Sequence, residues 1–228
     1  GQRRWDPPSS DITQVVHLVQ SRAEKSASLY QIFATLEPGS RVIIFVKDKR
    51  TLDQLAAEEM MKQMGACVFF VDGFYGGSLW ALPDFKSGKR PVILTIAPPV
   101  SLERRDDHPL SLSRDVEVRA VINYDITDLE TYVQRLGHTG LKAVHSFIDA
   151  AVDFDSEIGS GGARKHDGTA IEARTWDAKE YAYELCGIMC AGEQAIPPDL
   201  ADLAGLPDGS FRPADMNVLM DPLDGQSM

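Results

Sequence analysis

Short apolar runs of strand length alternate with helix-patterned segments along the first two-thirds of the chain, and this alternation constrains the fold more than any other feature. Residues 42–46 (VIIFV) form a continuous apolar run, which is typical of a strand buried on both faces. Strand, helix and strand in repeated succession predict a parallel sheet covered by helices on both faces. Ligands of such sheets bind at the carboxyl ends of the strands.

The predicted elements can be placed by residue number. Strands are expected over residues 12–20, 42–46, 67–72, 91–96, 120–125 and 143–149. Helices are expected between them over residues 24–36, 51–64, 80–86 and 128–136. The loops at the carboxyl ends of the inner strands therefore follow Val46, Asp72, Ile96 and Asp125.

Composition changes after residue 149 and divides the chain into five parts. We expect a linker or tag remnant over residues 1–10, an α/β domain over 11–150, a polar Gly-rich loop over 151–175, a helical extension over 176–205 and a tail over 206–228. A helix over residues 177–191 of the extension is expected to pack against the sheet.

Acidic residues outnumber basic ones by 34 to 23, which gives a net charge of −11. This balance argues against indiscriminate coating of nucleic acid, which depends on an excess of Lys and Arg. A local basic patch is still compatible with it, and its candidate members are Lys49, Arg50, Lys86, Lys89 and Arg90.

Three cysteines, an odd number, indicate an intracellular, reducing compartment rather than a disulfide framework. No apolar run approaches the ~20 residues of a membrane helix, so no membrane partner is expected. Cys186 and Cys190 lie four residues apart on a predicted helix. Two buried helix cysteines are the favoured interpretation, and half of a metal site is the alternative.

Motifs of several catalytic classes are missing from the sequence. It contains no G-x-x-x-x-G-K-[ST] phosphate loop, no D-E-x-D carboxylate pair, no H-E-x-x-H helix and no G-x-S-x-G nucleophile turn. We therefore assign no catalytic residue and no metal ligand to this chain.

Four segments in order carry a family resemblance. They are RVIIFVKDKRTLDQLA (41–56), DFKSGKRPVIL (84–94), VINYD (121–125) with YVQRLGHTG (132–140), and LCGIMCAGEQAIPPDLADLA (185–204). Together they resemble the second, carboxy-terminal RecA-like domain of DEAD-box RNA helicases. The resemblance implies an α/β RecA-like fold, a parallel sheet with helices on both faces, followed by a C-terminal helical extension.

The resemblance also implies site residues. RNA-binding positions would be Lys49, Arg50, Gly73 and Thr95, and positions in the nucleotide cleft would be Arg135, Gly137, His138, Thr139 and Gly140. For Lys49 and Arg50 the alternative is a solvated helix start, and for Arg135 it is an internal ion pair. ATP and Mg²⁺ would bind only together with an absent N-terminal RecA-like domain, and the chain alone would hold neither. Its expected partners are RNA, bound weakly, that N-terminal domain, and further proteins.

Several positions depart from the family pattern. His138 and Leu141 stand where the sixth motif has arginines that neutralise charge on the transferring phosphate. Ala97 replaces the fifth-motif carboxylate, although an insertion within residues 95–106 would change this alignment. Tyr75 and Ser78 replace a Gln and an Arg, and Pro83 is expected to disturb the helix that follows them.

Two hypotheses from different classes follow. In the first, the chain is the second RecA-like domain of a DEAD-box-type RNA helicase, which contributes RNA-backbone contacts and one wall of the ATP cleft but is inactive as an ATPase alone. In the second, it is a catalytically dead pseudo-helicase module that serves as an RNA or protein docking scaffold. An intact phosphate loop and D-E-A-D segment in the preceding domain would favour the first.

Overall fold

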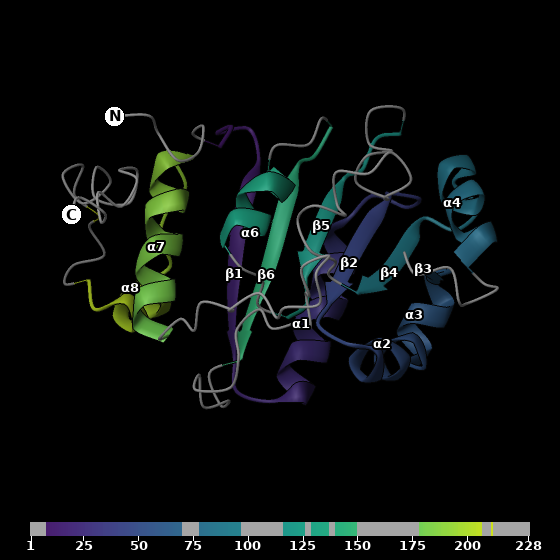
Figure 1. The fold of residues 1–228 in the computed structure, drawn as a ribbon, viewed down its shortest axis with the longest axis horizontal. Coiled ribbons are helices and arrows are strands. Elements are labelled where there is room, and N and C mark those ends of the chain that lie inside the picture. The colour runs from purple at the N-terminus through teal and green to yellow at the C-terminus, as the bar shows by residue number, and fades with distance from the viewer. Residues whose placement is uncertain are drawn as a thin grey trace, which may run out of the picture.

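A parallel sheet forms the middle layer of the computed structural model (Figure 1), which describes residues 8–69, 78–96, 116–125, 129–136, 140–149, 178–206 and 211. Within these residues the sheet has six strands in the order β1-β6-β5-β2-β4-β3, and every pairing is parallel. The strands are β1 (Thr13–Val19), β2 (Val42–Val46), β3 (Cys67–Phe69), β4 (Val92–Ile96), β5 (Ala120–Asn123) and β6 (Ala143–Asp149). The prediction of a parallel sheet is confirmed.

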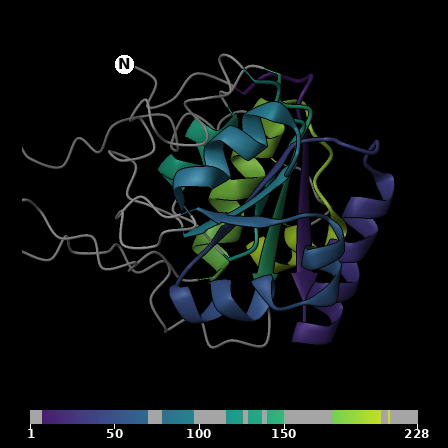
Figure 2. The same ribbon diagram turned by 90° about the vertical axis from the view of Figure 1, so that its right-hand side faces the viewer.

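Helices cover both faces of this sheet, as predicted (Figure 2). On one face lie α1 (Arg22–Thr35), α2 (Lys49–Ala56) and α3 (Glu59–Gln63), and on the other α4 (Ser78–Ser87), α6 (Leu129–Leu136), α7 (Ala178–Ala191) and α8 (Pro198–Ala204). Successive residues of a strand point to opposite faces. Accordingly Ile44 packs with the first group of helices, and Ile43 and Phe45 pack with the second.

Two helix predictions need correction. The helix expected over residues 51–64 is broken into α2 and α3, because Glu58 adopts an extended conformation (φ −65°, ψ 137°) between them. Its carboxylate accepts a hydrogen bond from Ser26 (3.4 Å) and lies 3.6 Å from the Arg22 guanidinium, which ties the break to α1. Pro83 was expected to disturb a helix, yet α4 continues through it. The bond that Pro83 cannot donate would go to the carbonyl of Leu79, in the first turn.

The helical extension packs against the sheet, as the sequence predicts. Buried side chains of α7 and α8, such as Leu185 and Leu200, share one apolar cluster with Val16 of β1 and Leu136 of α6. The Gln194 side chain, after α7, accepts a hydrogen bond from the backbone N–H of Gln14 (3.0 Å) and so covers part of the outer edge of β1. Within the described ranges, no helix combines the length and apolar character that crossing a bilayer requires.

Two histidines meet across β1 and β6. Nε2 of His17 lies 3.1 Å from Nδ1 of His145, and the His17 ring also packs against Phe147 with 4.9 Å between ring centroids. Burial lowers the pKa of both side chains. For His145, burial and the charge of His17 together lower the pKa to about 4. The folded state therefore favours neutral imidazoles here. This contribution to stability is complete above the ordinary pKa of 6.5 and is lost as the pH falls toward about 4.

We predict that replacing His145 with Gln reduces the acid sensitivity of the fold. The difference between a pKa of 6.5 and about 4 corresponds to about 3 kcal/mol of stability. Urea unfolding near neutral pH and near pH 4 should show the wild type losing more free energy of unfolding than His145→Gln, by up to about 3 kcal/mol. Parallel pH curves for the two proteins would contradict the prediction.

Candidate functional site

The loop after β2 forms the start of a candidate site at the carboxyl end of the sheet. Asp48 caps α2, since its side chain accepts a hydrogen bond from the backbone N–H of Thr51 at 2.8 Å. Burial alone would raise the pKa of Asp48, but the hydrogen bonds from Thr51 and the charges of Lys47 and Arg50 outweigh it and hold the pKa below its ordinary value. Asp48 therefore stays ionised and fixes the first turn of α2.

Three exposed cations surround this cap: Lys47, Lys49 and Arg50. We call residues 47–50 the cationic loop. The Lys49 ammonium is 2.5 Å from the Asp53 carboxylate, one turn further along α2, in an exposed pair. Backbone N–H groups at a helix N-terminus bind anions, and adjacent cations add to that attraction. The loop thus has the chemistry of a phosphate contact.

Asp125, which follows β5, connects that neighbouring strand to the cationic loop. Its Oδ2 accepts a hydrogen bond from the backbone N–H of Lys47 at 2.8 Å, and its Oδ1 accepts one from Lys25 Nζ of α1 at 3.1 Å. The Lys25 ammonium also lies over the Tyr124 ring, 3.9 Å from its centroid. The sequence-based assignment of site residues did not include Asp125 or Lys25. The VINYD segment at a strand's carboxyl end was the available signal for the first, and no local pattern marked the second.

Arg135 lies inside the domain. It is fully buried, its Nη1 donates a hydrogen bond to Asn123 Oδ1 at 2.5 Å, and its guanidinium stacks 3.6 Å from the centroid of the Phe45 ring. Asn123 in turn donates to Ser146 Oγ at 3.0 Å. This network joins α6 to β5, β2 and β6, and so gives Arg135 an internal structural role.

Of the other predicted site residues, the structure describes Thr95 and Gly140. Thr95 is at the carboxyl end of β4, beside Phe45 of β2, but its side chain is buried and donates to the carbonyl of Ile96 (3.4 Å). Gly140 has a φ of 83°, and a Cβ there would come within 3.2 Å of Glu117, so the backbone requires glycine. Four predicted residues lie outside the described ranges: Gly73, Gly137, His138 and Thr139.

Leu141, which aligns with an arginine of the family's sixth motif, is buried inside the domain. Its side chain is 4% exposed and belongs to the apolar cluster that contains Val118 and Val144. An arginine at this position would bury a charge among apolar side chains, at a cost of several kcal/mol. Restoring an arginine at residue 141 therefore requires a different local packing, which the sequence alignment alone did not reveal.

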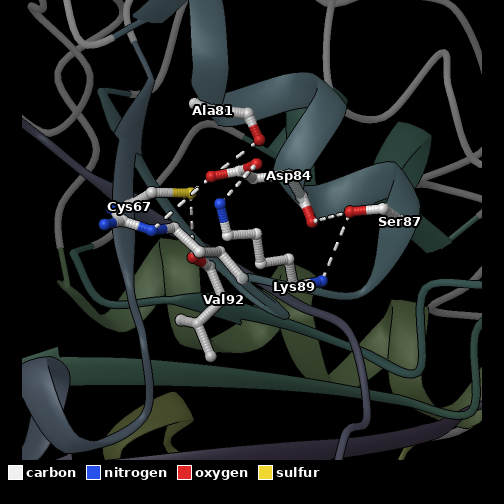
Figure 3. Close-up of polar contacts among 7 residues, drawn as sticks. Cys67, Ala81, Asp84, Ser87, Lys89 and Val92 are labelled. Carbon is white, nitrogen blue, oxygen red and sulfur yellow. Dashed lines mark hydrogen bonds and ion pairs between the residues drawn. The ribbon is translucent and has the colours of Figure 1, made fainter.

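The predicted basic patch is divided between two ends of the sheet, and this prediction was wrong. Lys86 lies in the last turn of α4, and Lys89 and Arg90 precede β4, so all three lie at the amino end of the strands, whereas the cationic loop follows a strand. Figure 3 shows the Lys89 side chain directed toward Asp84. The Asp84 carboxylate is 3.8 Å from Lys89 Nζ and 3.7 Å from Arg90 Nε, which offsets part of their charge.

The described cysteines are free thiols. Burial raises the pKa of Cys67 to about 11 and that of Cys186 to about 12, so both stay protonated near neutral pH. The Cys67 thiol points toward the carbonyls of Val92 and Ala81 (Figure 3), with its sulfur 3.4 Å from the first and 3.9 Å from the second. No group of three or more His, Cys, Asp or Glu side chains in the described part of the chain is arranged to hold a metal ion.

Comparisons with known proteins agree with this architecture. The family model described as "Helicase conserved C-terminal domain" matches residues 24–141. The chain is 33% identical over 194 residues to DEAD-box ATP-dependent RNA helicase 40 of Arabidopsis thaliana, which covers 85% of this chain and 15% of that protein. It is 30% identical over 198 residues to ATP-dependent RNA helicase DBP2 of Scheffersomyces stipitis, covering 84% and 31%. The chain thus spans less than a third of either relative.

A solved structure shares the fold over most of the chain. The yeast DEAD-box splicing factor Prp28 superposes with a TM-score of 0.61 at 19% identity, covering 88% of this chain and 38% of that one. At this level of identity the likeness concerns the fold alone.

We predict that the two arginines of this region differ sharply in their effect on stability. Arg135→Ala removes a buried guanidinium and leaves Asn123 with an unpaired acceptor, so it should lower the free energy of unfolding by about 3 kcal/mol. Arg50→Ala removes the same charge from an exposed position and should change it by less than about 0.5 kcal/mol. Denaturant unfolding measures both, and equal losses would refute the internal role of Arg135.

Proposed function

This chain belongs to the helicase conserved C-terminal domain family and is a second RecA-like domain of the DEAD-box RNA helicase kind, and from that premise we propose that the carboxyl end of its sheet contacts the backbone of RNA. The observation that carries the proposal is the cationic loop, held at the N-terminus of α2 by Asp48 and Asp125. Such a loop binds phosphates irrespective of base sequence.

We further propose that the same end of the sheet forms one wall of an ATP cleft, with an N-terminal RecA-like domain forming the other. The relatives are named as ATP-dependent RNA helicases, and this sequence has no phosphate loop of its own. Without a cluster of metal ligands in its described part, the chain is not expected to hold Mg²⁺ alone. The chain's own contribution would be to position RNA phosphates and to close the cleft.

A pseudo-helicase remains the second candidate, and the buried Leu141 favours it. A leucine packed in the core supplies no cation to a developing phosphate charge, and removing one such arginine from phosphoryl-transfer enzymes costs on the order of 10³–10⁵ in rate. In this reading ATP is hydrolysed slowly or not at all, and the domain serves to dock RNA or protein.

The isolated chain is predicted to bind single-stranded RNA weakly, with affinity that falls steeply as salt rises. Arg50→Ala should weaken binding and reduce the slope of log affinity against log salt by about 0.7, because one phosphate contact is lost. Lys89→Ala is the matched control, since it removes the same charge from the amino end of the sheet. Fluorescence anisotropy with labelled oligouridine measures both. Equal losses in the two variants would mean that only net charge matters.

A second prediction concerns hydrolysis in the protein that joins this chain to its N-terminal RecA-like domain. We expect RNA-stimulated ATP hydrolysis well below that of DEAD-box relatives and none from the isolated chain. His138→Arg should raise the rate of ATP hydrolysis. Leu141→Arg should leave that rate unchanged and lower the melting temperature, because residue 141 is buried. Phosphate release assays test this, and ordinary helicase rates in the wild type would contradict it.

A further inference from the structure

Asp125 contacts two elements that are far from it in the sequence, the loop after β2 and helix α1, at the carboxyl end of the sheet. It follows β5, and its two carboxylate oxygens bind in different directions, one to the backbone N–H of Lys47 and one to the ammonium of Lys25. The side chain of Asp125 is 15% exposed and that of Lys25 10%, so the pair is largely shielded from water.

We propose that Asp125 is a positioning residue for RNA binding, which fixes the cationic loop in its phosphate-binding conformation through the N–H of Lys47. This inference rests on the proposed function of the loop. Lys47 is the first residue after β2, so a hydrogen bond to its N–H sets the direction in which the chain leaves the sheet. The Asp48 cap and the exposed Arg50 follow within three residues.

Lys25 offsets the negative charge of Asp125. A carboxylate beside a phosphate-binding loop would ordinarily repel the RNA backbone. The Lys25 ammonium, 3.1 Å from Asp125 and stacked over Tyr124, offsets that negative charge from the inner side. The carboxylate thus supplies two acceptors while its effect on an approaching phosphate is reduced.

The alternative is that Asp125 only stabilises the fold through its ion pair. The two roles predict opposite signs for RNA binding. Removing a carboxylate from the neighbourhood of the loop should strengthen the binding of a polyanion if charge alone matters. It should weaken binding if the carboxylate holds the loop in place.

The experiment compares Asp125→Ala with Asp53→Ala in the full chain, using labelled oligouridine at low salt. Both variants lose one negative charge near α2, but Asp53 is exposed and pairs with Lys49, whereas Asp125 accepts the hydrogen bond from the Lys47 N–H. We expect Asp125→Ala to bind roughly three- to tenfold more weakly than wild type. Asp53→Ala should bind as tightly as wild type or more tightly. Asp125→Asn, whose amide oxygen can still accept from Lys47, should recover part of the loss.

Two further readouts separate positioning from simple stability. Amide hydrogen exchange at Lys47 should accelerate in Asp125→Ala while exchange at Ile44, in the middle of β2, stays slow. In a double-mutant cycle, Asp125→Ala should cost little more RNA affinity once Arg50→Ala is present, because both act through one loop.

The outcomes distinguish the two proposals. If Arg50→Ala weakens RNA binding but Asp125→Ala and Asp53→Ala both leave it equal or tighter, the positioning role is overturned and the RNA-binding loop stands. If neither Arg50→Ala nor Asp125→Ala weakens binding, the proposed function of the loop fails and the positioning role fails with it.

Discussion

The parallel register of the sheet is the constraint on which the rest of this structure depends. Because neighbouring strands run in one direction, the residues after β2 and β5 meet at the carboxyl end, and Asp125 can reach the backbone of Lys47. The same register puts Lys89 and Arg90 at the amino end. The cations that we assigned to one basic patch from the sequence therefore lie at opposite ends of the strands.

Beneath that end of the sheet, one polar network is buried rather than exposed. Arg135 stacks on Phe45 and binds Asn123, so an arginine of the sixth-motif segment joins α6 to the strands. Leu141, a few residues later, packs into the same side of the domain. The structure thus retains the parts that hold the RecA-like fold together. Leu141, which aligns with an arginine of the family's sixth motif, is apolar and buried.

The parallel sheet and its two helical layers followed from the sequence because a buried parallel strand such as Val42–Val46 has a distinctive continuous apolar pattern. The break at Glu58 and the helix through Pro83 did not, since each depends on tertiary contacts or on where a missing N–H falls within a helix. The burial of Leu141 and the contact between Lys25 and Asp125 could not be predicted from the sequence either. Lys25 is 100 residues from its partner Asp125, and only the folded sheet brings them together.

RNA phosphates are proposed to bind at the carboxyl end of this sheet, at the cationic loop. The most direct test is a titration of the isotope-labelled chain with oligouridine, followed by the backbone amide resonances. The account predicts that the largest shifts occur at Lys49, Arg50 and Thr51, at the N-terminus of α2. Shifts concentrated instead at Lys89 and Arg90, with the α2 amides unchanged, would contradict it.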